Sequence, residues 1–291
     1  MDVTIGIVLA LTTALAWGSR EILLRKAFEA TRPANALFAT IAATFIISFI
    51  VAIFYESALW DRFTLADVTL WTIVGLLHFP MAMTLYYLGI DSVGASRTSV
   101  VSNISVVVTP FLGMALLGEP STVTVTAGVI LAGAGIFTVS TSEIRSGEWR
   151  WQKGIAYALL AGLGWSVTNF LTRFGFATIR LPMTALSIAS GIPLLLTAFY
   201  LIPRDKRASM LLDMRRSRQL VSGSFLSAVG QVTLFAALSF APTIYVVPTY
   251  NLKSLVTVLL AYAVIPTSER MNKRVILGAI LAIGGIVLIN L

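Results

Sequence analysis

The sequence predicts an all-α integral membrane protein whose ten transmembrane helices form two five-helix repeats of opposite orientation. Three observations predict this fold class. Of 291 residues, 57% are hydrophobic and 12% are charged, and the mean hydropathy is +0.88. That is more apolar surface than a soluble fold can bury. Apolar runs of about 20 residues, the length that spans a bilayer, recur along the chain. The first half of the sequence also resembles the second.

The apolar runs predict ten helices in order. These helices cover residues 3–25, 34–55, 68–88, 95–117, 122–141, 154–174, 182–203, 219–240, 244–266 and 273–291. The runs do not alternate polar and apolar residues and are about twice as long as the strands of a membrane barrel, which excludes a barrel. Only two linkers are long, residues 142–153 and the basic segment 204–218.

The repeat is visible in the first helix of each half, where GIVLALTTALAWGSREILLRKAF (6–28) aligns with GIAYALLAGLGWSVTNFLTRFGF (154–176). The matched residues are Gly6 with Gly154, Trp17 with Trp165, Arg25 with Arg173 and Phe28 with Phe176. Near the ends of the halves, Glu119, Gly128 and Gly135 match Glu269, Gly278 and Gly285. Because each half has an odd number of helices, the halves are expected to be inverted relative to each other. The predicted organisation is a first repeat over 1–141, a linker over 142–153 and a second repeat over 154–291.

The basic residues predict the orientation. If both termini lie on one side, the loops of that side carry only Arg62, Arg173 and Arg180, and the opposite loops carry most of the 21 Lys and Arg residues. Since positive loops stay in the cytoplasm, both termini are predicted to be outside a cell membrane. The N-terminus has Asp2 and no basic region, so it does not resemble a cleaved signal peptide.

Composition also excludes several functions. The chain has no cysteine and one histidine, so disulfides, thiol catalysis and a Cys/His metal cluster are excluded, and no cofactor or metal is expected. The net charge of +8 lies in short loops and not in a basic stripe with interleaved aromatics, so nucleic acid is not an expected partner. The sequence contains no Walker motif, so ATP is not expected to be the direct energy source.

Residues 85–137 and 234–288 share a further pattern, in which a small-residue turn, a long helix, an end that bears a glutamate and a Gly-rich helix follow one another. This pattern resembles the drug/metabolite transporter superfamily in its EamA branch. The resemblance implies a ten-helix inverted repeat and secondary transport. The halves have diverged, since Gly118 precedes Glu119 but Ser268 precedes Glu269, and Pro110 and Pro248 occupy different places.

Lys253 is the most informative single residue, because it falls near the middle of the ninth helix, where a charge costs at least about 2.5–3.5 kcal/mol. It is interpreted as an anchor for a substrate carboxylate or phosphate, or alternatively as a buried partner of Glu21. Pro248 should free backbone groups nearby. Tyr245, Thr249 and Lys253 are expected on one helix face, with Tyr250 and Asn251 beside them.

Other polar and aromatic residues of the predicted helices join this candidate substrate site. Asn103 aligns with Lys253 across the repeat, and either contributes to a central site or forms an interhelical hydrogen bond. Trp17 and Glu21 recur as Trp165 and Asn169. The tryptophans either wall a pocket or only pack. Glu21 either binds a proton or a substrate amine, or pairs with Arg20 or Arg25. Arg20 is expected to extend toward the helix end.

His78 and Tyr86 share a face of the third helix, and Gln231 is the nearest polar counterpart in the other half. These residues either line the cavity or relay protons, or else only form hydrogen bonds.

The predicted function is secondary active transport of a small polar metabolite, such as an amino acid or another carboxylate- or phosphate-bearing solute, by alternating access. The expected partners are this solute and the lipid bilayer, with protons as a candidate coupling ion, and a monomer is expected to suffice. The alternatives are a flippase of a lipid-linked or amphiphilic substrate and, less favoured, an intramembrane enzyme that uses His78 and Glu21. No catalytic residue is assigned.

Overall fold

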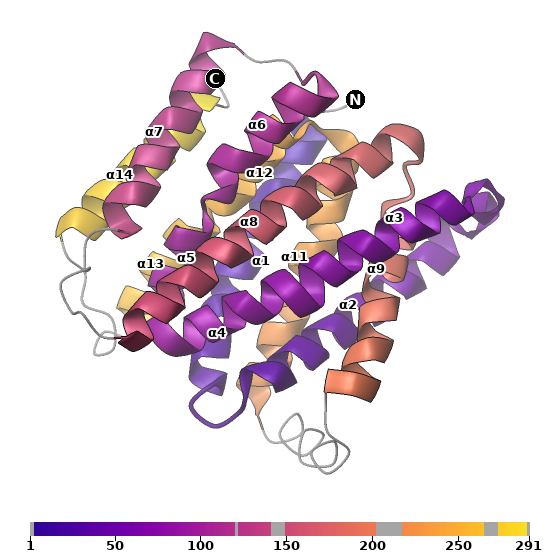
Figure 1. Cartoon of the computed structure of the whole chain (residues 1–291), viewed down its shortest axis with the longest axis horizontal. Helices are drawn as coiled ribbons and strands as arrows, with labels where there is room; N and C mark the ends of the chain where they lie inside the picture. Colours follow the sequence, from indigo (N-terminus) through magenta and orange to yellow (C-terminus); the bar gives the residue numbers. More distant parts are fainter. Residues whose placement is uncertain (1–2, 120–121, 141–148, 202–216, 265–272, 290–291) are drawn as a thin grey trace.

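The computed structural model in Figure 1 describes residues 3–119, 122–140, 149–201, 217–264 and 273–289. These residues form helices joined by short connections, and no strand occurs among them. Glu269, most of the basic segment 204–218 and most of the linker predicted at 142–153 lie outside these ranges.

The helices of the first half follow one another with short loops. They are α1 (Val3–Ala27), α2 (Pro33–Tyr55), the 3₁₀ turn η1 (Ser57–Arg62), α3 (Leu65–Leu76), the π-helix η2 (Leu77–Met83), α4 (Thr84–Val93), α5 (Ala95–Ser102), α6 (Ser105–Leu117) and α7 (Val123–Ser140). The second half also consists of helices that follow one another, but its π-helix is at the end of α9. It contains α8 (Trp149–Thr178), α9 (Pro182–Leu196), the π-helix η4 (Thr197–Leu201), α11 (Arg218–Phe240), α12 (Thr243–Asn251), α13 (Lys253–Val264) and α14 (Lys273–Ile289).

Eight helical segments in the described part are long and apolar enough to cross a bilayer. They are Val3–Ala27, Pro33–Tyr55, Leu65–Val93, Ala95–Leu117, Gln152–Thr178, Pro182–Phe199, Arg218–Phe240 and Thr243–Val264. Two apolar helices are shorter in the ranges searched, Val123–Gly135 and Ile276–Ile289. All ten segments lie where the hydropathy predicted helices, and eight of them have the length that the prediction required.

Two of the predicted helices are broken in the middle, one in each half. The chain leaves the α-helical pattern after Ser102, where Asn103 and Ile104 donate to carbonyls three residues back, and resumes it at Ser105. The ninth predicted helix is interrupted at Leu252, between α12 and α13. Pro248 lies inside α12, so the break comes four residues after the proline that was expected to cause it.

The third predicted helix contains a π-helical segment around a proline. Pro80 has no N–H to donate, and the surrounding residues Leu77–Met83 adopt the wider π-helix. His78 lies in this segment and is buried. π-Helical segments inside α-helices are frequently found at functional sites.

The two halves pack against each other through matched pairs of helices. α1 lies along α11, and α8 lies along η2 and α4. α2 contacts α9, and α7 contacts α14 at one edge of the bundle, as Figure 1 shows. The main buried core therefore contains aromatic side chains from both halves, among them Trp17, Trp71 and Trp165.

One arginine in each half binds the C-terminal end of a neighbouring helix. Arg25 Nη1 donates to the carbonyl of Ile90, 3.3 Å away and 65 residues later, near the end of α4. Arg173 Nη1 donates to the carbonyl of Leu238, 3.0 Å away and also 65 residues later, near the end of α11. The last carbonyls of a helix have no partner within it and carry partial negative charge. These arginines therefore have the same role in both repeats.

Two glutamates of the first half cap helices of the second half. Glu56, which follows α2, accepts hydrogen bonds from the amides of Met183 and Thr184 at 3.0 and 2.7 Å, at the start of α9. Glu119 accepts from the amide and hydroxyl of Thr243 at 2.9 and 2.6 Å, at the start of α12. A carboxylate at a helix N-terminus satisfies free amides and interacts favourably with the helix dipole.

Candidate functional site

Three charged side chains are completely buried where the two halves meet. Arg20 and Glu21 lie on α1, Lys253 begins α13, and all three have exposed fractions of 0%. Close packing of α1 on α13 brings them together. A Cβ at Gly18 would lie 2.5 Å from Val256 Cβ and 2.9 Å from the Lys253 carbonyl oxygen, so only glycine allows this approach.

Glu21 is held by neutral donors. The Tyr86 hydroxyl donates to its Oε1. The Thr257 hydroxyl lies 2.8 Å from the Lys253 carbonyl oxygen and 2.5 Å from Glu21 Oε2, and its single proton is best donated to the nearer, charged carboxylate. Both oxygens of the carboxylate are therefore occupied by hydroxyl groups from α4 and α13. The sequence offered Arg20, Arg25 or Lys253 as an ion-pair partner, but none of them supplies these two hydrogen bonds.

The Lys253 ammonium lies among four aromatic rings. Its Nζ is 4.5 Å from the ring centroid of Trp165, 5.2 Å from Tyr86, 5.3 Å from Trp17 and 5.8 Å from Tyr250. In the described part of the chain Nζ has no hydrogen-bond partner. We call Trp17, Tyr86, Trp165 and Tyr250 the aromatic cage. All four distances are within the range of cation–π attraction.

Arg20 lies beside the aromatic cage, and its predicted extension toward the helix end is wrong. Its Nη1 donates to the Ser227 hydroxyl of α11 at 2.6 Å, and its guanidinium carbon lies 4.8 Å from the Trp17 centroid. The Nε and Nη2 atoms have no partner in the described residues. The side chain turns inward because Ser227 and Trp17 offer it contacts there. Arg20 follows Trp17 by three residues, a spacing that places both side chains on one helix face. This spacing could have predicted that Arg20 lies beside Trp17.

Gly230 fixes the position of Trp17. The indole packs on α11, and its Nε1 donates to the Ser227 carbonyl at 3.2 Å. A Cβ at Gly230 would overlap the Nε1 and Cδ1 atoms and lie 2.9 Å from Cε2. Trp17 also stacks on Trp165 at 6.3 Å and meets the edge of Tyr250 at 5.4 Å. The matched tryptophans of the repeat are therefore in contact with each other.

His78 lies at one side of the aromatic cage, 6.1 Å from the Trp165 ring. The Gln231 amide contacts its Nε2, and its Nδ1 lies 3.4 Å from the Thr168 hydroxyl. If Gln231 donates, the proton of the imidazole is on Nδ1 and points to Thr168. His78, Gln231 and Thr168 are thus joined in one hydrogen-bonded chain, a contact that the sequence had not predicted.

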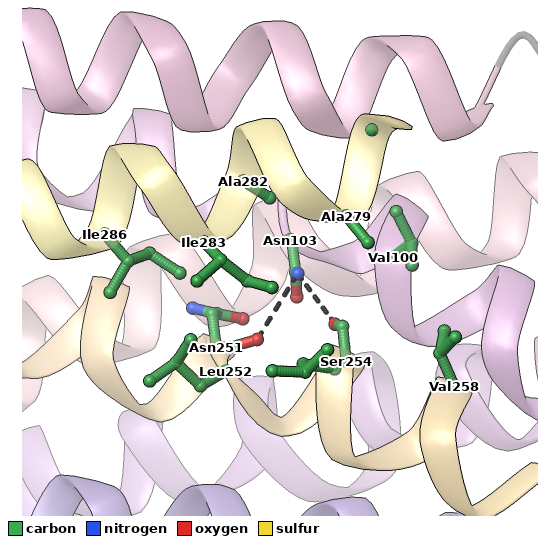
Figure 2. Close-up of a pocket in the computed structure, with 12 residues that line it drawn as sticks. Val100, Asn103, Asn251, Leu252, Ser254, Val258, Ala279, Ala282, Ile283 and Ile286 are labelled. Atoms are coloured by element: carbon green, nitrogen blue, oxygen red, sulfur yellow. Dashed lines mark hydrogen bonds between the residues drawn. The ribbon is translucent and has the colours of Figure 1, made fainter. Parts of the chain in front are cut away.

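Asn103 and Asn251 meet where the two broken helices are interrupted (Figure 2). Asn103 Nδ2 donates to the Ser254 hydroxyl at 2.7 Å and to the backbone carbonyl oxygen of Asn251 at 3.5 Å. Both side-chain carbonyl oxygens are buried and lack a partner in the described chain. They border a cavity of about 20 Å³, which has room for about one water molecule. Asn103 thus contacts Asn251 and Ser254, while Lys253 faces the aromatic cage.

Of the remaining predicted residues, Asn169 contacts the aromatic cage, whereas Thr249 and Tyr245 contact other parts of the bundle. Asn169 Nδ2 donates to the Tyr250 hydroxyl at 2.7 Å, so it supports one wall of the aromatic cage. Thr249 is buried and its hydroxyl donates to the Tyr245 carbonyl at 2.6 Å. Tyr245 packs against a separate apolar cluster that includes Val125. The break at Leu252 interrupts the helix, so Tyr245 and Lys253 do not share the predicted face.

The arrangement offers more cationic donors than it has acceptors for them. Three nitrogen atoms of Arg20 and Lys253 lack a hydrogen-bond partner in the described chain, while Glu21 already accepts two hydrogen bonds. Buried charges without partners are costly. A carboxylate or phosphate group would provide the missing acceptors. No group of three or more metal-ligating side chains occurs in the described residues.

Comparison with known proteins identifies the family. A family model described as the EamA-like transporter family matches residues 4–141 and 152–291. No curated protein matches the chain. A solved crystal structure, described only as that of a protein, aligns over 98% of both chains with a TM-score of 0.72 and 15% identity, a likeness that concerns the fold alone. Since the two family matches cover nearly the whole sequence, this multi-pass membrane chain belongs to the EamA-like transporter family.

Proposed function

We propose that this protein is a secondary active transporter of a small polar solute that carries a carboxylate or phosphate group. One observation carries the proposal: Arg20 and Lys253 are buried where the two halves meet, and they retain nitrogen donors that have no partner among the residues the structure describes. Arg20 offers its Nε and Nη2, which together suit a bidentate anionic group, and Lys253 offers a flexible ammonium.

Alternating access is the proposed mechanism. Arg20, Glu21 and Lys253 are fully buried, so a solute reaches them only when helices move apart. Transporters with inverted repeats place the substrate between the halves, beside helices that are interrupted near the bilayer midplane. The breaks at Asn103 and Leu252 and the contact of Trp17 with Trp165 are consistent with such a site.

The proposed architecture is ten transmembrane helices in two inverted repeats, 1–141 and 154–291, joined by a linker over 142–153. The equal 65-residue spacing of the Arg25 and Arg173 contacts supports a structural repeat. We place the protein in a cell membrane with both termini outside, from the distribution of basic loops. A single chain contains both halves, so a monomer is sufficient. Glu21 is the proposed proton-binding group if transport is coupled to protons.

A flippase of an amphiphilic substrate is the second candidate. It is favoured by an apolar cavity of about 490 Å³ between α2, α3 and α9, which is lined by Phe45, Phe49, Trp60, Ile188 and Leu195 among others. Acyl chains would fit such a surface, but the cavity contains none of the unpartnered cationic groups. The small-solute proposal therefore remains the first.

The test is thermal unfolding of purified protein with carboxylates, phosphorylated metabolites, amines and long-chain lipids. A ligand at 100 times its Kd stabilises the folded state by about 2.7 kcal/mol. Anionic or zwitterionic ligands should stabilise the wild type but not Lys253→Ala. They should also stabilise the control variant Lys273→Ala, which removes an exposed lysine at the start of α14. Ligands that pass this test are then assayed for uptake into liposomes.

Stabilisation that persists in Lys253→Ala, or that comes from cations alone, would contradict the anion site. Stabilisation by long-chain lipids, with no effect of small anions, would favour the flippase.

A further inference from the structure

The rings around the Lys253 ammonium are better suited to another kind of cationic group than to a primary ammonium. Four rings lie within 6 Å of Nζ, but no group in the described chain accepts a hydrogen bond from it. The nearby carboxylate of Glu21 accepts from Tyr86 and Thr257. A primary ammonium in this position loses its hydrogen bonds to water and, besides an electrostatic attraction to Glu21, gains only ring contacts.

A quaternary ammonium has no N–H group and so loses no hydrogen bond when it enters the same position. Its charge and methyl groups are matched by aromatic faces, which is how aromatic cages bind such cations. The aromatic cage is therefore better suited to a trimethylammonium group than to the lysine that occupies it.

The charges of the site indicate what else the ligand carries. Arg20, Lys253 and Glu21 have formal charges that sum to +1 when all are ionised. A simple cation would add to this excess, whereas a zwitterion leaves it unchanged and supplies a carboxylate for the free donors of Arg20 and Lys253.

We propose that the aromatic cage is the subsite for a trimethylammonium group of a zwitterionic, betaine-type substrate, and that Lys253 occupies it in the empty transporter. On binding, the flexible Lys253 side chain leaves the rings and pairs with the carboxylate of the substrate. This inference rests on the proposed function, because it uses the same anion site.

The test compares three ligands of the wild-type protein by isothermal titration calorimetry. Glycine betaine carries the trimethylammonium group, 3,3-dimethylbutanoate replaces its nitrogen by carbon and has no positive charge, and glycine has a primary ammonium. Betaine should bind at least about ten-fold more tightly than either of the others, since ring faces attract the cation and leave no N–H unpaired.

The aromatic cage is tested by Trp165→Leu, with Trp71→Leu as the matched control. Trp71 is also buried, but it packs on Phe176 and Phe235, away from the ammonium. Trp165→Leu should remove the preference for betaine over 3,3-dimethylbutanoate, and Trp71→Leu should keep it. Equal binding of these two ligands by the wild type, or tighter binding of glycine than of betaine, would overturn the inference.

A further arm separates this inference from the proposed anion site. In Lys253→Ala the rings are vacated, so choline, which has no carboxylate, should bind this variant at least about ten-fold more tightly than the wild type. If none of the three carboxylates binds the wild type but choline binds Lys253→Ala, the proposed anion site is refuted, and the aromatic cage is supported as a subsite for a quaternary ammonium. If choline binds neither protein, the aromatic cage is refuted.

Discussion

Replacing Gly230 by alanine should displace Trp17 and destabilise the protein. The added Cβ would overlap two atoms of the indole ring and lie 2.9 Å from a third. The ring cannot move without cost, because its Nε1 is bound to Ser227 and its faces contact Trp165 and Tyr250. Overpacking of this kind costs about 1–3 kcal/mol, and loss of the hydrogen bond adds about 1 kcal/mol.

The expected difference is measured against Gly284→Ala. Both substitutions exchange glycine for alanine within a helix, so each gains about 0.5–1 kcal/mol from helix propensity. A Cβ at Gly284 meets only Leu131 at 3.7 Å, which is an ordinary contact. The difference between the two variants therefore isolates the clash, about 2–4 kcal/mol in total.

Thermal unfolding in detergent gives the first readout, and betaine affinity gives the second. Gly230→Ala should melt several degrees below Gly284→Ala, since each kcal/mol corresponds to about 2–4 °C in chains of 150–250 residues. It should also lose the preference for betaine. Equal melting temperatures for the two variants would refute the assignment of Gly230 as the residue that positions Trp17.

Three other predictions concern the caps, the buried arginine and the topology. Glu119→Ala should cost about 1–3 kcal/mol, because it leaves buried amide donors at the start of α12 unpaired; unchanged thermal unfolding would contradict the cap. Arg20→Met should be as stable as the wild type or more so, since replacing buried charges by apolar groups is often stabilising, yet calorimetry should detect no anion binding; retained binding would exclude Arg20 from the site. Alkaline phosphatase fused after Leu291 should be active if the C-terminus is outside, and activity only of a cytoplasmic reporter would reverse the topology.

The sequence predicted the helices well because bilayer length and hydropathy are local properties. It also identified Lys253, since a charge in the middle of an apolar run must face the protein interior. Trp17 and Trp165 were recognised from the repeat alone. Their mutual contact could not be known from the sequence, because it depends on how the halves pack.

Arg20 and Tyr245 show what local patterns miss. Arg20 is near enough to the helix end to reach it, but Ser227 of α11 offers an inward partner. The placement of Tyr245 depends on where the helix breaks, and that position is Leu252 instead of Pro248. Both outcomes are decided by residues far away in the sequence, so spacing within one helix cannot predict them.

The carboxylates of Glu56 and Glu119 make the second half depend on the first for its folding. Each one completes the N-terminus of a helix, α9 or α12, that begins in the second half. Residues 149–289 produced alone would contain both helix starts without their acceptors. Together with the pairing of α1 on α11 and of α2 on α9, these caps join the two halves into one packed unit despite the repeated sequence. A gene that encodes only the second half is therefore expected to give a stable product only when the first half is supplied with it.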